Sequence, residues 1–413
     1  MQLKETVERI VRTTPVTDMH THLYSVDFSE LLLWGIDELL IYHYLVAESF
    51  RWTKEDYAEF WAKSKADQAN WIWNKVFLEH SPVSEAASGL ITIFHRLGLD
   101  VSSRNLNAFR AAWAQRSAAE QIELVLSIAN VRDVVMTNDP FDPLEQLVWL
   151  EREGNKDARF HAALRVDPLL NQWEKAQQQL KGMGYAVSLE WTVQTQAEVH
   201  RFLTEWIERM DVLYMAVSLS GDFAYPADDH CTRMIDQVLI PVCQEKQIPF
   251  ALMIGVRRQV NPQLQLAGDM SMRSDVGAVE SLCRRYPKQK FLITMLAREN
   301  QHELTVLARK FRNLMVFGCW WFLHIESMVT EMTRIRMELL GTSFIPQHSD
   351  CRVLEQLIYK WEHSRTIIAK VLLEKYEKLQ SQGWPLSEVD IQRDVDDLFS
   401  MNFWNFVGRE RKW

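Results

Sequence analysis

Short apolar runs alternate with longer amphipathic stretches along most of the chain. The runs are rich in Val, Ile and Phe, as expected for strands, and lie at residues 15–22, 133–137, 159–165, 214–220, 249–255, 290–296, 313–322 and 343–349. Apolar residues at helical spacing occupy intervening segments such as 235–247, 277–286 and 299–312. Alternating strands and helices are typical of an α/β protein with a parallel sheet, and eight strands predict a closed (β/α)₈ barrel of the TIM type. An open, doubly wound sheet is the alternative.

Two regions depart from this alternation. Residues from about 24 to about 130 carry apolar residues three and four positions apart and no strand pattern. We expect them to form a helical insertion after the first strand, over the mouth of the barrel. Residues from about 353 to 413 are also helical in pattern. Because the sequence contains no Gly/Ser linker and no short repeat, we predict a single domain over residues 1–413.

The composition is that of an ordinary globular protein and excludes several functions. Of 413 residues, 47% are hydrophobic and 24% are charged, and the formal net charge is −9. No run of Lys or Arg forms a basic stripe, which argues against a nucleic-acid partner. No apolar stretch approaches the roughly 20 residues of a membrane helix, and the polar start does not resemble a secretory signal. With five scattered cysteines that fit reduced thiols, we expect a cytoplasmic protein without a membrane partner. We also expect a homo-oligomer.

Candidate metal ligands occur at the end of the first predicted strand. Side chains two residues apart in a strand face the same side, so His20 and His22 project together. The carboxyl end of a barrel strand is also where TIM-barrel enzymes place their active sites. Such a pair forms half of a metal site. Two histidines that hydrogen-bond to carbonyl groups or water are the other interpretation.

The last predicted strand offers the remaining ligand. His348, Asp350 and Arg352 follow one another at spacings of two, so all three would share one face. The eighth strand of a closed barrel pairs with the first, which would place Asp350 beside His20 and His22. Two imidazoles and one carboxylate suit one divalent ion, Zn²⁺ in the first place and Mn²⁺ as the alternative. A surface ion pair between Asp350 and Arg352 is the competing interpretation.

Six motifs span nearly the whole chain. They are DMHTHL (18–23), IYHYLVAE (41–48), TNDPFD (137–142), ALRVDP (163–168), FGCWWF (317–322) and QHSDCR (347–352). In this order they resemble the uronate isomerases, or glucuronate isomerases, of the amidohydrolase superfamily. The resemblance implies a metal-dependent barrel that converts D-glucuronate to D-fructuronate and D-galacturonate to D-tagaturonate. It implies a hexuronate substrate, one divalent metal ion and no organic cofactor.

The resemblance also implies roles for individual residues. It makes His20, His22 and Asp350 the metal ligands. The residues that it implies for handling the substrate are His43, Tyr44, Arg165 and Arg352. Trp320 and Trp321 end the seventh predicted strand, where one fits the core and the other a wall of the sugar pocket.

The residues alone leave other interpretations open. His43 and Tyr44 lie in an otherwise apolar helical stretch, where a core histidine and a buried tyrosine are the ordinary case. Arg165 ends a strand, so its guanidinium would reach the barrel mouth and grip a carboxylate through two hydrogen bonds. A salt bridge from Arg165 to Asp167 or Asp139 is the alternative.

At one position the chain differs from the family that it resembles. Most uronate isomerases carry a histidine on strand five in an HxGxxR context, whereas residues 253–258 here read MIGVRR, with Met253 in the histidine's place. The sixth predicted strand likewise ends at Met295 and Leu296. We therefore expect a divergent subgroup whose metal is held by fewer protein ligands.

Three functions are consistent with these residues. The leading one is aldose–ketose isomerisation through a cis-enediol, with Asp350 relaying a proton in ring opening and Tyr44, assisted by His43 or Arg352, moving the C2 proton. The alternative is a zinc-dependent hydrolase of the same superfamily with Asp350 as its base, against which the missing histidines of strands five and six count. The third is a sugar-acid binding protein without catalysis, which would have no need of Tyr44 and Asp350.

Overall fold

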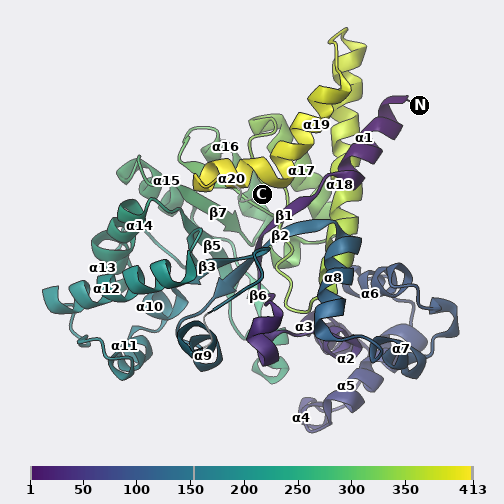
Figure 1. Cartoon of the computed structure of the whole chain (residues 1–413), viewed down its shortest axis with the longest axis horizontal. Helices are drawn as coiled ribbons and strands as arrows, with labels where there is room; N and C mark the ends of the chain where they lie inside the picture. Colours follow the sequence, from purple (N-terminus) through teal and green to yellow (C-terminus); the bar gives the residue numbers. More distant parts are fainter. Residues whose placement is uncertain (1, 152–153, 411–413) are drawn as a thin grey trace.

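A parallel sheet at the centre of the molecule organises the chain (Figure 1). The computed structural model describes residues 2–151 and 154–410. Its strands pair in the order β1-β2-β3-β4-β5-β7-β8, and each neighbouring pair is parallel. The strands are β1 (Val16–Thr21), β2 (Val131–Asn138), β3 (Phe160–Arg165), β4 (Met215–Ser220), β5 (Phe250–Arg257), β7 (Phe291–Met295) and β8 (Leu314–Val316). A short β6 (Met270–Ser271) pairs antiparallel with the end of β5.

The strands are covered on both faces, as a parallel sheet requires. Every residue of β1 and of β7 is buried, the pattern of strands that lie between helices and a packed interior. Strand order follows chain order, so that the sheet curls as in a TIM-like barrel. The α/β class and the first seven predicted strands are therefore confirmed.

Residues 345–352, which we call the closing segment, lie between β8 and β1. The beginning of the segment hydrogen-bonds to the chain at the end of β8. Near its end, Asp350 N donates to His20 O over 3.2 Å, and His22 N donates to Cys351 O over 2.8 Å. The two edge strands of the sheet are thus joined through this segment.

The prediction of a regular eighth strand at 343–349 is wrong. Among the described residues, this stretch forms only one isolated bridge, to the residue that follows β8. Pro346 has no amide hydrogen for a ladder, and Asp350 has a positive φ of 50°, so regular pairing cannot continue. The strand predicted at 313–322 is also too long, because β8 covers only its start and Gly318 turns the chain with a φ of 65°.

Helices occupy the chain between β1 and β2. They are η1 (Val26–Leu31), α2 (Ile36–Leu40), α3 (His43–Ser49), η2 (Phe50–Trp52), α4 (Tyr57–Trp61), α5 (Lys65–Ile72), η3 (Trp73–Leu78), α6 (Glu85–Arg96), η4 (Val101–Ser103), α7 (Leu106–Trp113) and α8 (Ala118–Ala129). In Figure 1, α2 to α7 gather at the lower right, beside the sheet. This places α3, which begins with His43, near the strand ends.

Further helices alternate with the later strands. They are α9 (Pro143–Glu151), α10 (Asp167–Asn171), α11 (Trp173–Gly182), α12 (Val193–Met210), α13 (His230–Met234), η5 (Ile235–Leu239), α14 (Ile240–Lys246), η6 (Pro262–Gly268), α15 (Val276–Arg285), η7 (Arg298–Asn300), α16 (Gln301–Ala308) and η8 (Trp321–Leu323). Most of them lie on the left of Figure 1, outside the sheet.

The two ends of the chain pack together on one edge of the molecule. The terminal helices are α1 (Gln2–Thr13), α17 (Glu326–Leu340), α18 (Gln356–Ser381), α19 (Glu388–Asp396), η9 (Asp397–Met401) and α20 (Asn402–Val407). The long α18 contacts α1, α6, α8 and α17, and Figure 1 shows α1 and α19 beside it. Helix α18 begins a few residues after the closing segment and therefore links this segment to the helical region after β1.

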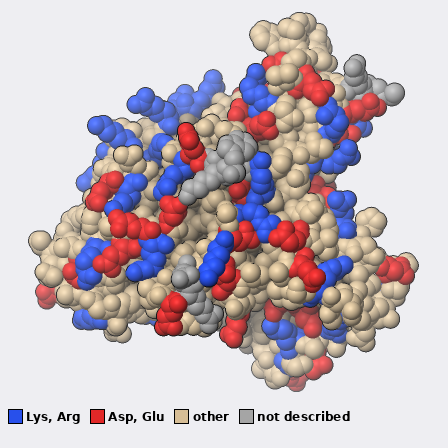
Figure 2. Space-filling model, viewed as in Figure 1, with Lys and Arg blue, Asp and Glu red and all other residues tan. Residues whose placement is uncertain are grey.

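The surface and the helices agree with a globular protein. On the face shown in Figure 2, acidic and basic side chains are interspersed. Among the described residues, no helix has the length and apolar character needed to cross a membrane.

Candidate active site

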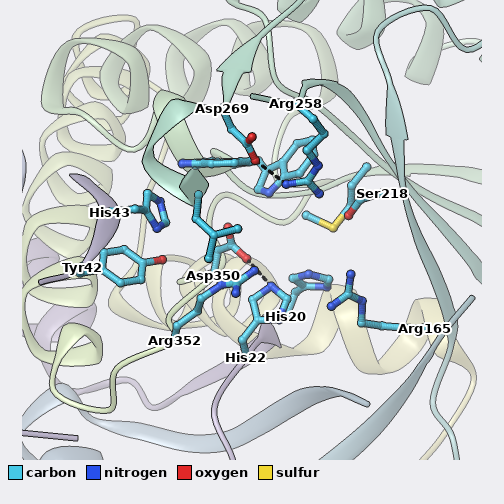
Figure 3. A pocket seen from close by; sticks show the side chains of 14 residues that line it. His20, His22, Tyr42, His43, Arg165, Ser218, Arg258, Asp269, Asp350 and Arg352 are labelled. Carbon is cyan, nitrogen blue, oxygen red and sulfur yellow. Dashed lines mark hydrogen bonds and ion pairs between the residues drawn. The ribbon is translucent and has the colours of Figure 1, made fainter. Parts of the chain in front are cut away.

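A cavity lies at the carboxyl ends of the strands. Its wall is formed by β1, β3, β4 and β5, the closing segment, the chain after β8 and the helical region after β1 (Figure 3). The lining residues are His20, His22, Tyr42, His43, Arg165, Ser218, Met253, Arg258, Leu266, Asp269, Trp320, Trp321, Asp350 and Arg352. The cavity therefore brings together every predicted site residue except Tyr44.

His20 and His22 reach the cavity from the end of β1. The alternation of the strand turns both side chains toward the same side, as predicted. Burial lowers the pKa of His20 to about 3, and burial together with the Arg352 charge lowers the pKa of His22 to about 4. Both imidazoles are therefore neutral at physiological pH and have a lone pair to offer.

Asp350 approaches the same point from the closing segment. Its Oδ1 atom lies 3.2 Å from His22 Nε2 (Figure 3). Burial alone would raise the pKa of Asp350. In the acidic range where a carboxyl group titrates, however, His22 and His20 become protonated, and their positive charges outweigh burial and hold the pKa of Asp350 below its usual range. The carboxyl group is therefore ionised at neutral pH.

These three side chains form a donor set for one divalent cation. One ligand atom from each of His20, His22 and Asp350 lies within 4.8 Å of the others. At neutral pH His22 is neutral and Asp350 carries a negative charge that a cation beside both residues would balance. Two nitrogens and one oxygen suit a borderline ion such as Zn²⁺ or Mn²⁺. The residues present therefore fit a single divalent metal ion.

Three arginines face the cavity, and they differ in their partners. Arg165, at the end of β3, forms two hydrogen bonds of 3.0 and 3.2 Å with Asp167. Arg258, just after β5, forms an ion pair of 2.5 Å with Asp269. The Arg352 guanidinium makes no ion pair or hydrogen bond with any described residue. Arg352 is therefore the cation of the cavity wall that is left free for an anionic ligand.

The chain around the start of α3 contributes Tyr42 and His43 but not Tyr44. Figure 3 shows the Tyr42 hydroxyl pointing into the cavity. Tyr44 is outside the lining, and its buried hydroxyl has no hydrogen-bond partner among the described residues. The predicted helical stretch is broken here, because α2 ends at Leu40 and α3 begins only at His43, with Tyr42 extended between them. The structure thus places Tyr42, which the sequence analysis missed, where Tyr44 was expected.

Trp320 and Trp321 follow β8 and both line the cavity. Trp320 is buried, while Trp321 is half-buried with its ring centroid 5.5 Å from that of His43. A Cβ atom on Gly318 would lie 1.7 Å from His348 Nδ1, so only glycine lets the chain before these tryptophans pass the closing segment. The expectation that one tryptophan belongs to the core is half right, because the buried one also forms the wall.

His348 does not face the cavity, although its spacing from Asp350 predicts that it would. Its buried ring packs against His20 and Phe317, with centroid distances of 5.5 and 5.1 Å. Neither ring nitrogen has a hydrogen-bond partner in the described part of the chain. Since Asp350 has a positive φ, residues two apart no longer share a face as they do in a regular strand.

Further residues that the sequence did not predict also line the cavity, and they fall into two groups. Ser218 and Arg258 lie near the ends of β4 and β5, so their position at the carboxyl ends of predicted strands could have found them. Leu266 and Asp269 lie in and after η6, where no periodic pattern signals their approach to the cavity. Met253, noted as a departure from the family, does line the cavity.

Comparison with known proteins gives a clear structural relationship. The chain matches no protein-family model and no curated protein. Among solved structures it is similar to a uronate isomerase from Bacillus halodurans C-125, with a TM-score of 0.97 and 56% sequence identity over 99% of this chain and 97% of that chain.

Two more distant structures share the fold. One is a uronate isomerase from Thermotoga maritima, with a TM-score of 0.79 and 15% identity over 98% of this chain and 97% of that chain. The other is a glucuronate isomerase from Caulobacter crescentus, with a TM-score of 0.78 and 15% identity over 100% of this chain and 95% of that chain.

Proposed function

The chain belongs to the uronate isomerase family, and from this premise we propose that it converts D-glucuronate to D-fructuronate and D-galacturonate to D-tagaturonate. One observation carries this proposal beyond the family relationship. His20, His22, Asp350 and the free guanidinium of Arg352 converge in one cavity at the strand ends, where TIM-barrel enzymes hold their substrates.

Recognition of the substrate's carboxylate falls to the arginines of the cavity wall. Arg352 has no partner among the described residues, so a planar carboxylate gains two charge-assisted hydrogen bonds from it. Arg165 is already held by Asp167, which fixes its direction and leaves its remaining N–H groups for the sugar. A neutral hexose offers no anion to Arg352 and should bind poorly.

The reaction itself requires proton transfers and no redox cofactor. After ring opening, a base removes the proton at C2, a cis-enediol forms, and the proton returns at C1. Asp350 is ionised and can accept the proton released in ring opening. Two phenols are candidates for the C2 step: Tyr42, whose hydroxyl points into the cavity, and Tyr44, whose buried hydroxyl lacks a partner among the described residues.

His20, His22 and Asp350 would hold a divalent ion, with Zn²⁺ the first expectation and Mn²⁺ the second. When bound, such an ion polarises the sugar's oxygens and stabilises the negative charge that develops on them. Met253 offers no imidazole from β5, which supports a site with few protein ligands.

The zinc-dependent hydrolase is not favoured, because the solved structure with 56% identity is an isomerase. In the same proposal the closing segment serves as the eighth element of a closed (β/α)₈ barrel, since hydrogen bonds join it to both edge strands. A homo-oligomeric state and a cytoplasmic location stay predictions.

Incubation with each uronate tests the proposed function. Purified protein is mixed with D-glucuronate or D-galacturonate, and formation of the matching ketose is followed by NMR. We expect conversion of both uronates and none of D-glucose, which lacks the carboxylate. If neither uronate is converted, with and without added Zn²⁺ or Mn²⁺, the proposal fails.

A further inference from the structure

The two histidines of β1 are held by the same kind of hydrogen-bond arrangement. His20 Nδ1 lies 3.0 Å from the hydroxyl oxygen of Tyr214. The same hydroxyl donates to the Met19 carbonyl oxygen over 2.6 Å. A phenol has a single hydrogen to donate, so in the contact with His20 it must be the acceptor. His20 therefore carries its proton on Nδ1.

His22 repeats this arrangement with a different hydroxyl. Its Nδ1 lies 2.9 Å from Thr137 Oγ1, and Thr137 Oγ1 donates to the Thr21 carbonyl oxygen over 2.8 Å. The threonine hydroxyl has thus used its only hydrogen and accepts one from His22 Nδ1. Like His20, His22 carries its proton on the ring nitrogen that faces away from Asp350, whose Oδ1 lies 3.2 Å from His22 Nε2.

The two hydroxyls come from different parts of the sheet, and each is rigidly placed. Tyr214 directly precedes β4 and is fully buried, and its side chain reaches β1 from there. Thr137 lies near the end of β2, which pairs directly with β1, and is 1% exposed. Each hydroxyl bonds to the main chain next to the histidine that it contacts, so it cannot rotate without losing that bond.

We infer that Tyr214 and Thr137 are positioning residues that fix the tautomers of His20 and His22, so that both Nε2 lone pairs are offered to one divalent cation beside Asp350. The inference rests on the proposed function only for the role of that cation. With the proton on the other nitrogen, either imidazole would present an N–H group to the ion instead of a lone pair. Each hydroxyl donates its hydrogen to a main-chain carbonyl, of Met19 or Thr21, and can therefore only accept one from the histidine. This leaves Nε2 of each imidazole without a proton.

Isosteric variants test this inference by cation binding rather than by turnover. Co²⁺ is titrated into protein freed of metal, and binding is followed by its visible absorption. We expect Tyr214→Phe and Thr137→Val each to weaken Co²⁺ binding by about 10- to 100-fold, the usual cost of losing a partner behind a ligand. Thr137→Ser retains the hydroxyl and should restore most of the affinity.

Control variants remove buried hydroxyls that lie away from the site. Tyr376 donates to Asp394, and Thr305 donates to the Gln301 carbonyl oxygen. Tyr376→Phe and Thr305→Val should lose stability, measured by thermal unfolding, without losing Co²⁺ affinity. If Tyr214→Phe does not fold, the Thr137→Val and Thr137→Ser pair decides alone.

The outcomes separate this inference from the proposed function. Val and Phe variants that bind Co²⁺ within about twofold of wild type would overturn the inference, as would an equal loss in Thr137→Ser and Thr137→Val. A wild-type protein that binds no Co²⁺ would overturn it as well. A protein that binds Co²⁺ through these residues but converts neither uronate would leave the inference standing and remove the proposed function.

Discussion

The end of β1 and the closing segment bring ligand atoms to the same point by different means. His20 lies in β1, and His22 follows the strand directly. The ladder between β1 and β2 continues to Thr21 with a shift of register after Asp18, and buried hydroxyls contact the two imidazoles. The closing segment has one isolated bridge and few main-chain hydrogen bonds to its neighbours. Its geometry is set instead by buried side chains.

Those side chains act on Ser349, directly before Asp350. Ser349 N donates to Asp18 Oδ1 over 2.9 Å, and Lys360 Nζ donates to Ser349 O over 2.5 Å. Asp18 and Lys360 are 0% and 1% exposed, so both side chains are desolvated where they bind Ser349. These two hydrogen bonds to Ser349, together with the bond from Asp350 N to His20 O, stabilise the left-handed φ of 50° at Asp350. Residues other than glycine usually avoid this conformation.

The difference shows which interactions set the positions of the ligand atoms in this cavity. A strand carries its side chains on backbone hydrogen bonds that almost any sequence can make. Apart from Tyr214 and Thr137, whose hydroxyls hold the two imidazoles, single substitutions around β1 should therefore cost stability more than activity. An irregular segment depends on particular side chains, and their loss should displace Asp350 itself. The following changes test this contrast, from the largest expected effect to the smallest.

Asp350→Asn should have the largest effect, a loss of about 10³-fold or more in kcat, because it removes both an anionic ligand and a proton acceptor while keeping the shape. Ketose formation from D-glucuronate measures it. Asp269→Asn is the matched control, since Asp269 also lines the cavity but is engaged with Arg258. Retention of more than a tenth of the activity in Asp350→Asn would show that Asp350 is not a reacting group.

Arg352→Met should lower kcat/KM for D-glucuronate by about 30- to 5,000-fold, the equivalent of ~2–5 kcal/mol for a lost charged contact. Arg165→Met should also lower it, by less, since Asp167 already engages that guanidinium. Steady-state kinetics with both uronates and with D-glucose measures the two variants. An equal loss on D-glucose would mean that the arginine holds the site rather than the carboxylate.

Tyr44 and Tyr42 are the two candidates for the C2 proton transfer, one from the sequence and one from the cavity lining. The family resemblance implies Tyr44, whereas Tyr42 lines the cavity and Tyr44 lies with its ring 5.8 Å from Lys360 Nζ. Replacement by Phe of the tyrosine that moves the C2 proton should lower kcat by about 10²-fold, with little change in KM. The other Phe variant should stay within about threefold of wild type. Wild-type rates in both variants would exclude a phenol from the step.

The same contrast explains how far the sequence could predict this molecule. Strand periodicity located His20 and His22, and the end of a strand located Arg165, because regular structure converts spacing into direction. It failed for His348, whose spacing from Asp350 means nothing once Asp350 takes a positive φ. It failed for Tyr42, because a break between two short helices is not visible in apolar spacing.

Lys360→Met should lower kcat by about 10-fold while the protein stays folded, because the Ser349 carbonyl loses its partner and Asp350 can leave its left-handed conformation. Arg365 on the same helix is the matched control: it is also buried and donates only to main-chain carbonyls, of Thr14 among others, away from the cavity. Arg365→Met should lower the melting temperature without changing kcat. Equal kcat in the two folded variants would contradict the contrast.

Glu145→Gln should have the smallest effect on activity, because Glu145 is a buried carboxyl group on the β1 side of the comparison and does not line the cavity. It accepts hydrogen bonds from Tyr24, just after β1, and from Asn138, the last residue of β2. Burial raises the pKa of Glu145 to about 7, against 4.5 for its ordinary value. Between these pH values the folded protein binds more protons than the unfolded chain, so this group's contribution to stability falls as the pH rises.

Glutamine cannot ionise and resembles the protonated acid, so the variant should gain stability relative to wild type as the pH increases from about 4.5 to 7. The gain should be at most about 1.4 kcal/mol per pH unit, since one group can release at most one proton. Urea unfolding of both proteins at pH 5 and at pH 7.5 measures the difference, and kcat at pH 7.5 should agree within about twofold. A tenfold loss of kcat would show that a buried acidic side chain positions reacting groups on the β1 side as well. The contrast between β1, which is held mainly by backbone hydrogen bonds, and the closing segment, which is held by side chains, would then be wrong.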